Sequence, residues 1–124
     1  MKSLHTCIRV KDLEKSVEFY KDAFGYVETR RADFPEGNFT LVFLALPGES
    51  YELELTYNYD REEPYDLGNG YGHIALGVED LEAKYKELSD KGYEVTELKG
   101  LNPGKPNYFF AIDPDGYKIE VIRL

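Results

Sequence analysis

Apolar residues recur at different spacings along the chain, and the spacing predicts which segments are helices and which are strands. Between Asp12 and Gly25, and again between Asp80 and Gly92, apolar residues return every three or four positions, which is the period of one helix face. The two aspartates are the predicted N-caps and the two glycines the predicted stops. Shorter runs rich in β-branched and aromatic residues, separated by Pro and Gly turns, indicate strands. Strands are therefore expected at residues 4–10, 26–33, 39–46, 51–57, 72–78, 93–98, 108–113 and 117–124, with a turn at 113–116 between the last two.

The order of these elements occurs twice, and so does part of the sequence itself. Residues 5–14 (HTCIRVKDLE) align with residues 73–82 (HIALGVEDLE), and residues 51–55 (YELEL) align with residues 117–121 (YKIEV). Each copy therefore has the order βαβββ. A copy of about 60 residues is marginal as an independent domain, so the two copies are expected to share a core or to pair across a dimer.

We therefore predict an α+β fold made of one domain, residues 1–124, with two βαβββ modules at residues 1–65 and 66–124. The simplest architecture packs two four-stranded curved sheets around a central cleft, with the helices outside. Residues 58–70 form the join between the modules and are polar, with one proline and two glycines. This join is long enough for the modules to meet within one chain or across a dimer.

Charge and composition exclude several classes of partner. The 15 Lys and Arg residues against 24 Asp and Glu residues give a net charge of −9, whereas nucleic acids and anionic membrane surfaces attract basic proteins. One cysteine cannot form an internal disulfide, which fits a reducing compartment. No apolar stretch approaches the roughly 20 residues of a membrane span, and the chain runs into its first strand without a signal peptide. We expect a cytoplasmic protein that binds neither nucleic acid nor membrane.

Each copy carries one histidine and one glutamate at matching positions. His5 matches His73 in the first strand of each copy, and Glu54 matches Glu120 in the last strand. Two copies related by a pseudo-two-fold axis bring these residues towards one point, where two imidazoles and two carboxylates make a candidate divalent-metal site. Either histidine alone reads as an ordinary strand residue, and Glu52 lies on the same strand face as Glu54. The register of the repeat is what singles out the four candidates.

Four motifs, in order, carry a resemblance to a known family: LHTCIRV at residues 4–10, ELTYN at 54–58, YGHIA at 71–75 and DPDGYKIE at 113–120. With these motifs the whole chain resembles the glyoxalase I branch of the vicinal oxygen chelate superfamily, in its compact bacterial type. The resemblance implies paired βαβββ modules, a homodimer, and isomerisation of the hemithioacetal of methylglyoxal and glutathione to S-lactoylglutathione. It also implies one divalent metal per site, with nickel or cobalt favoured and zinc possible, bound by the matching positions His5, Glu54, His73 and Glu120.

The resemblance also implies substrate-binding residues. Arg9 and Asn58 match positions that hold the γ-glutamyl end of glutathione, and Lys105 is a candidate for binding its glycyl carboxylate. Without the resemblance, Arg9 could bind a substrate carboxylate or form a structural ion pair. Asn58 could bind a ligand or be a turn residue. The loop 100–106 departs from the glycine-rich stretch expected in the family, so the identity of the thiol stays open. Cys7 shares a strand face with Arg9, and we expect it to be a small buried side chain.

The implied reaction moves a proton from C1 to C2 of an α-hydroxyketone-like adduct with no net redox change. A divalent metal acting as a Lewis acid stabilises the enediolate that develops, and a carboxylate carries the proton between the two carbons. We expect Glu120 to be the principal base, with Glu54 as the partner that serves the other substrate face. Four protein ligands leave two positions on an octahedral ion but none on a tetrahedral zinc, which favours nickel or cobalt.

Three other functions fit the same fold. An epimerase of acyl-CoA thioesters uses similar metal chemistry, but the ELTYN run at residues 54–58 favours glyoxalase. An iron dioxygenase needs two histidines and one carboxylate, and the second glutamate argues against it. A metal-free drug-binding protein needs no ligand set, and four intact candidate ligands argue against that function.

Overall fold

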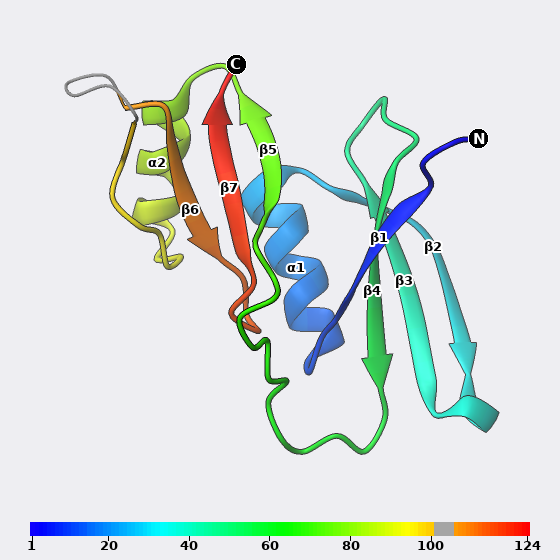
Figure 1. The fold of residues 1–124 in the computed structure, drawn as a ribbon. Coiled ribbons are helices and arrows are strands. Elements are labelled where there is room, and N and C mark those ends of the chain that lie inside the picture. The colour runs from blue at the N-terminus through cyan, green and yellow to red at the C-terminus, as the bar shows by residue number, and fades with distance from the viewer. Residues whose placement is uncertain (101–105) are drawn as a thin grey trace. The chain divides into compact units, whose positions relative to one another are not determined.

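The computed structural model describes residues 1–100 and 106–124 of the chain. Its helices and strands follow the predicted order over most of the chain (Figure 1). Among the described residues, no helix is long and apolar enough to cross a membrane. The elements are β1 (His5–Arg9), α1 (Leu13–Phe24), β2 (Val27–Phe34), a short 3₁₀ helix η1 (Pro35–Gly37), β3 (Phe39–Ala45), β4 (Glu52–Asn58), β5 (Ile74–Val78), α2 (Leu81–Asp90), β6 (Tyr108–Ile112) and β7 (Lys118–Arg123).

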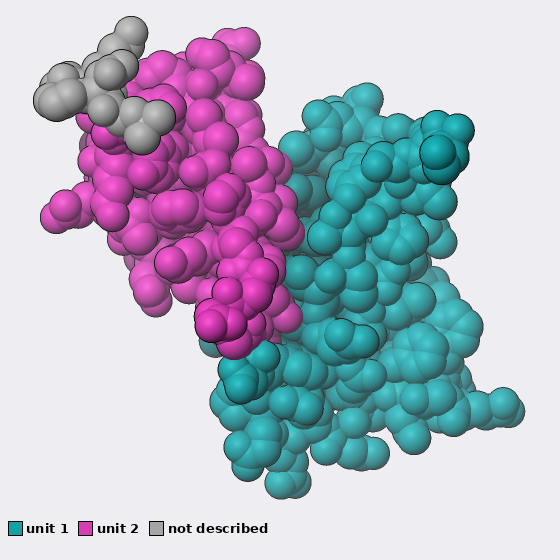
Figure 2. Space-filling view, in the orientation of Figure 1, with its two compact units in different colours: residues 1–66 teal, residues 67–124 magenta. Residues whose placement is uncertain are grey.

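The chain divides into two compact units, Met1–Asp66 (unit 1) and Leu67–Leu124 (unit 2), which Figure 2 shows in different colours. In the described residues each unit contains one α-helix and one mixed sheet, which confirms the predicted α+β class. The order of elements is βαβββ in unit 1, as predicted, and βαββ in unit 2.

In both sheets the first strand of the unit pairs with the last. The strand order is β1-β4-β3-β2 in unit 1 and β5-β7-β6 in unit 2. β1 runs parallel to β4, and β5 runs parallel to β7, whereas the other pairs are antiparallel. Residues far apart along each copy of the repeat therefore lie on neighbouring strands.

Helix packing decides which face of each last strand is apolar. In unit 1 α1 packs against β4, where Leu53 and Leu55 are buried. Because side chains alternate along a strand, Glu54 between these leucines points to the opposite face of the sheet. In unit 2 α2 packs against β7, and two buried apolar residues flank Glu120 in the same way.

Each helix begins at its predicted aspartate. The Asp12 carboxylate accepts a hydrogen bond from Lys15 N at 3.2 Å, and the Asp80 carboxylate accepts one from Ala83 N at 3.0 Å. The first helix ends as predicted at Gly25, whose φ of 76° lies in the left-handed region that favours glycine. The helices are therefore held at their ends by the local sequence and at their faces by the sheets.

The predicted strand at residues 93–98 is wrong. In this range Val95 makes an isolated bridge to Ala111 of β6, and the next bridge, from Lys99 to Tyr108 of β6, lies just beyond it. Thr96 N donates to Phe110 O at 2.8 Å, but Phe110 N donates to the Thr96 hydroxyl at 2.9 Å. A side-chain oxygen thus replaces the backbone acceptor that a continuous ladder needs. The described sheet of unit 2 is therefore three-stranded rather than four-stranded.

β5 begins two residues later than predicted, at Ile74, so that His73 immediately precedes the strand. Lys118 is the first residue of the neighbouring strand β7, and its carbonyl accepts a hydrogen bond from the Tyr71 hydroxyl at 2.8 Å. Because the Tyr71 hydroxyl binds this carbonyl, the backbone pairing of β5 with β7 does not extend back to His73.

The Asp-Pro-Asp-Gly sequence at residues 113–116 forms the predicted turn between β6 and β7. Asp113 is buried, and its Oδ1 accepts hydrogen bonds from Asp115 N at 2.9 Å and from Tyr117 N at 2.8 Å. One carboxylate oxygen thus satisfies two backbone donors where the chain reverses.

Replacing Asp113 with alanine removes the acceptor for both backbone N–H groups. We expect the Asp113→Ala free energy of unfolding to fall by about 2 kcal/mol, because two backbone hydrogen bonds to the carboxylate are lost, one of them buried. Asp113→Asn keeps an acceptor oxygen at this position and should lose less than half as much. Urea unfolding followed by circular dichroism measures both changes, and an alanine variant as stable as the parent would contradict this role of the side chain.

Candidate metal centre

Unit 1 brings the first predicted histidine and glutamate together. His5 is the first residue of β1, and Glu54 lies on the neighbouring strand β4. The two strands are parallel and in a register that places Cys7 directly opposite Glu54. His5 Nε2 lies 3.2 Å from Glu54 Oε1.

Unit 2 repeats this arrangement. His73 Nε2 lies 3.4 Å from Glu120 Oε1, and Ala75 of β5 lies opposite Glu120 as Cys7 lies opposite Glu54. Each unit therefore places two of the four predicted ligands in contact. Within the described part of either unit, no third His, Cys, Asp or Glu side chain completes a metal-binding group around its pair.

A phenylalanine that was not predicted as a site residue stands beside each pair. Phe43 of β3 lies opposite Glu54, and its ring meets the His5 imidazole edge to face with centroids 5.5 Å apart. Phe110 of β6 has the same place in unit 2, with centroids 5.6 Å apart. The two phenylalanines occupy matching positions in the strand before the last, so the repeat carries the signal that finds them. An aromatic ring at this distance restricts the orientation of the imidazole.

The spacing of the donor atoms in each pair suits two ligands of one metal ion. Ligand bonds of about 2.1 Å separate neighbouring donor atoms by about 3.0 Å at a right angle and about 3.4 Å at the tetrahedral angle. The observed separations of 3.2 Å and 3.4 Å lie in this interval. Neutral imidazole nitrogen and carboxylate oxygen are donors suited to zinc and other divalent transition metals. Each pair therefore fits as part of the coordination of a divalent metal.

Glu52, the other acidic candidate on β4, is engaged elsewhere. Its Oε1 accepts a hydrogen bond from Arg30 Nη2 at 3.1 Å, and the Thr29 hydroxyl donates to its Oε2. The hydrogen bonds from Arg30 and Thr29 hold the pKa of Glu52 below its usual value. Glu52 thus belongs to an ion pair, and Glu54 is the carboxylate beside His5.

Cys7 is exposed, so the expectation of a small buried side chain is wrong. Along β1 it is Ile8, the next residue, that takes the buried position. Cys7 Sγ lies 3.2 Å from Thr56 Oγ1, and the Thr56 hydroxyl donates to Glu54 Oε2 at 2.9 Å. Desolvation of the sulfur raises the pKa of Cys7, an effect that the Thr56 hydrogen bond opposes and Glu54 reinforces.

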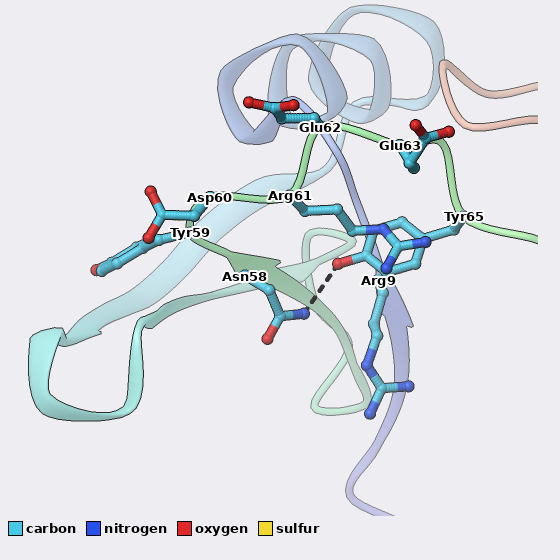
Figure 3. Close-up of a pocket in the computed structure, with 8 residues that line it drawn as sticks. All are labelled: Arg9, Asn58, Tyr59, Asp60, Arg61, Glu62, Glu63 and Tyr65. Carbon is cyan, nitrogen blue, oxygen red and sulfur yellow. Dashed lines mark hydrogen bonds between the residues drawn. The ribbon is translucent and has the colours of Figure 1, made fainter.

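The predicted substrate residues Arg9 and Asn58 line one pocket of unit 1, shown in Figure 3, with a volume of about 520 Å³. Asn58 ends β4, and its Nδ2 donates to the Tyr65 hydroxyl at 2.9 Å. Arg61 lies over the Tyr65 ring, with its guanidinium carbon 3.9 Å from the ring centroid. The residues that line the pocket are Arg9, Asn58, Tyr59, Asp60, Arg61, Glu62, Glu63 and Tyr65.

Charges of both signs line this pocket. Arg9 and Arg61 supply two guanidinium groups, and the acidic run 60–63 supplies three carboxylates. Guanidinium groups bind carboxylates through paired hydrogen bonds, and carboxylates bind ammonium groups. The pocket therefore suits a ligand end with both an ammonium and a carboxylate, as in an α-amino acid. Arg61 and Tyr65 were not predicted as site residues, since an arginine inside an acidic loop reads as solvated surface. Lys105, the third predicted substrate residue, lies outside the described residues.

Known proteins resemble the chain over nearly its whole length. It is 48% identical to a probable lactoylglutathione lyase of Synechocystis sp., over 97% of this chain and 93% of that protein. It is 46% identical to the lactoylglutathione lyase of Neisseria meningitidis serogroup A, over 99% of this chain and 91% of that protein.

Solved structures share the fold. The trypanothione-dependent glyoxalase I of Leishmania major superposes with a TM-score of 0.88 at 36% identity, and the match covers 99% of this chain and 86% of that one. Residues 2–121, which include both histidine–glutamate pairs, match the family model described as Glyoxalase/Bleomycin resistance protein/Dioxygenase superfamily. The chain therefore belongs to the glyoxalase/bleomycin resistance protein/dioxygenase superfamily.

Proposed function

We propose that the chain is a metal-dependent glyoxalase I, a lactoylglutathione lyase that isomerises the hemithioacetal of methylglyoxal and glutathione to S-lactoylglutathione. The observation that carries the proposal is the contact of His5 with Glu54 in unit 1, repeated by His73 with Glu120 in unit 2. Relatives named lactoylglutathione lyase match nearly the whole chain and support the same function.

The two histidine–glutamate pairs are the residues that would hold one divalent metal per site. Four protein ligands leave two positions on an octahedral ion, which favours Ni²⁺ or Co²⁺ over a tetrahedral Zn²⁺. When bound, the metal supplies Lewis-acid stabilisation of the negative charge that develops on the substrate oxygens. The phenylalanine ring beside each imidazole keeps the histidines oriented for this role.

Glu120 is the residue that we propose moves the proton. Its carboxylate removes the proton from C1, and the electrons of that C–H bond form the C1–C2 double bond of an enediolate. The same carboxylate then returns the proton to C2. The C1 hydroxyl loses a proton and the C2 oxygen gains one, so C1 becomes the thioester carbonyl and C2 the alcohol. Glu54 is the second carboxylate, placed to serve the other face of the substrate.

Arg9 and Asn58 are proposed to hold the γ-glutamyl end of glutathione, which is an α-amino acid. The Arg9 guanidinium suits its α-carboxylate, and the carboxylates of the acidic run 60–63 suit its α-ammonium group. The bond from Asn58 to Tyr65 orients the amide before a ligand arrives. Lys105, outside the described residues, is proposed to bind the glycyl carboxylate.

We further propose that the protein works as a cytoplasmic homodimer. Each module supplies two of the four candidate ligands, so the full set is assembled within one chain or across two chains. The single thiol of Cys7 fits a reducing compartment.

Removing metal with a chelator should abolish isomerase activity, and Ni²⁺ or Co²⁺ should restore it more fully than Zn²⁺. Glu120→Gln should lower kcat by about 10²- to 10⁴-fold, because an amide cannot carry the proton. Formation of the thioester from methylglyoxal and glutathione, followed by its absorbance, measures both effects.

Glu52→Gln is the matched control for that experiment, since it makes the same chemical change on the same strand but outside the pair. It should keep kcat within about three-fold of the parent, as expected for a partly exposed ion pair. Parent protein that binds Ni²⁺ or Co²⁺ tightly yet turns over no hemithioacetal would overturn the proposed function.

Arg9→Ala should raise the KM for the glutathione hemithioacetal by about 10- to 100-fold, because a charged hydrogen bond to substrate is lost. The kcat should change much less, since Arg9 does not touch the reacting carbons. Arg31→Ala removes the same charge from an ion pair with Glu14 and Glu28 and should leave KM unchanged. Initial-rate kinetics distinguish the two, and equal KM values for Arg9→Ala and the parent would contradict the proposed binding role.

A further inference from the structure

We infer that Thr56 is a positioning residue that fixes the carboxylate of Glu54, and that the lack of a counterpart in unit 2 leaves Glu120 the less restrained of the two glutamates. This inference rests on the proposed function, in which both glutamates face a divalent metal. It assigns the two carboxylates unequal roles from the hydrogen bonds around them.

In unit 1 both oxygens of the Glu54 carboxylate have a partner. Oε1 lies 3.2 Å from His5 Nε2, and Oε2 accepts a hydrogen bond from the Thr56 hydroxyl at 2.9 Å. The oxygen of the same hydroxyl lies 3.2 Å from Cys7 Sγ. The single proton of the Thr56 hydroxyl is thus directed at the Glu54 carboxylate.

In unit 2 the matching positions are apolar. Ala75 lies opposite Glu120 as Cys7 lies opposite Glu54, and Ile122 follows Glu120 by two residues as Thr56 follows Glu54. Neither replacement has a donor to offer. In the described part of unit 2, the contact of Oε1 with His73 is accordingly the only polar side-chain contact of the Glu120 carboxylate.

This difference changes the freedom of the two side chains. A glutamate side chain has several rotatable bonds, and a hydrogen bond to one oxygen restricts them while leaving the other oxygen free for its ligand role. Glu54 is thereby suited to stay in place. Glu120 can turn from His73 towards a substrate carbon and back again, as a base that handles a proton at two neighbouring carbons must do.

A purely structural role for Thr56 predicts a different outcome. Threonine and valine have nearly the same shape and both favour strands, so a residue needed only for the ladder tolerates Thr56→Val without effect on the site. Serine keeps the hydroxyl but loses the methyl group. The pair of substitutions therefore separates the hydrogen bond from the packing.

Thr56→Val should weaken metal binding by about 10-fold, which is the smaller effect expected when a metal ligand loses its hydrogen-bond partner. The metal affinity of Thr56→Ser should stay within about three-fold of the parent value. Affinity for Ni²⁺ is measured by competition with a coloured chelator, independently of turnover. Ile122→Val, at the matching position of unit 2, is the control and should bind as the parent does. A Thr56→Val variant that binds Ni²⁺ as tightly as the parent, or a serine variant that fails equally, would overturn the inference. Parent protein that binds Ni²⁺ but has no isomerase activity would contradict the proposed function. The Ni²⁺ affinities of the Thr56 variants would still test the inference in that case.

Ile122→Thr makes the converse change by adding a hydroxyl two residues after Glu120. It should raise the affinity for Ni²⁺ by a few-fold and lower kcat by about 10-fold, because the base becomes restrained in the same way as Glu54. The KM should change little, since the substitution lies outside the pocket of Arg9. Ile122→Val separates the loss of apolar volume from the gain of the hydroxyl. An Ile122→Thr enzyme with the kcat of the valine control would contradict the unequal roles of the two glutamates.

Discussion

The pairing of the first strand with the last in each unit is the interaction on which the candidate site depends. The parallel register sets Cys7 against Glu54 and Ala75 against Glu120. A shift of one residue would turn each glutamate to the face that the helix covers and would expose its buried apolar neighbours. The free energy that holds the apolar residues inside therefore also holds the glutamates beside the histidines. Stability of the sheet and chemistry of the site follow from one register.

The sequence was sufficient to single out the two histidines and two glutamates, because strand alternation has a period of two and the repeat supplies a second reading of each position. It did not predict which strands pair. It was insufficient where a side chain competes with the backbone. The residues around Thr96 have the composition of a strand, yet the Thr96 hydroxyl accepts the bond from Phe110 N that a ladder would need. The composition around His73 likewise predicted that it lies inside a strand. In the structure the Tyr71 hydroxyl donates to the Lys118 carbonyl, and the strand begins after His73. Composition shows what each residue prefers and cannot show which partner its hydrogen bond will find.

The pocket shows a second limit of the sequence. Arg9 and Asn58 were predicted to lie together, and they line one pocket. Arg61 lies in an acidic run that reads as solvated surface, but the conformation of this loop brings its guanidinium over the Tyr65 ring. Stacking on an aromatic face orients an arginine without using its N–H donors, and here Arg61 Nη2 also donates to Pro64 O at 3.1 Å. A charged residue in a loop thus acquires a fixed direction through a contact within the loop itself.

Duplication of a module produces two equivalent carboxylates, whereas the proposed reaction makes two different demands on them. Keeping a metal in place needs a ligand that stays still, and carrying a proton between neighbouring carbons needs a carboxylate that turns. One side chain cannot meet both demands equally well. The substitutions that separate the copies, Cys7 and Thr56 in unit 1 against Ala75 and Ile122 in unit 2, lie directly around the two glutamates and leave the strand register unchanged. Divergence at these positions therefore divides the two tasks between copies while the shared sheet preserves the geometry that both require.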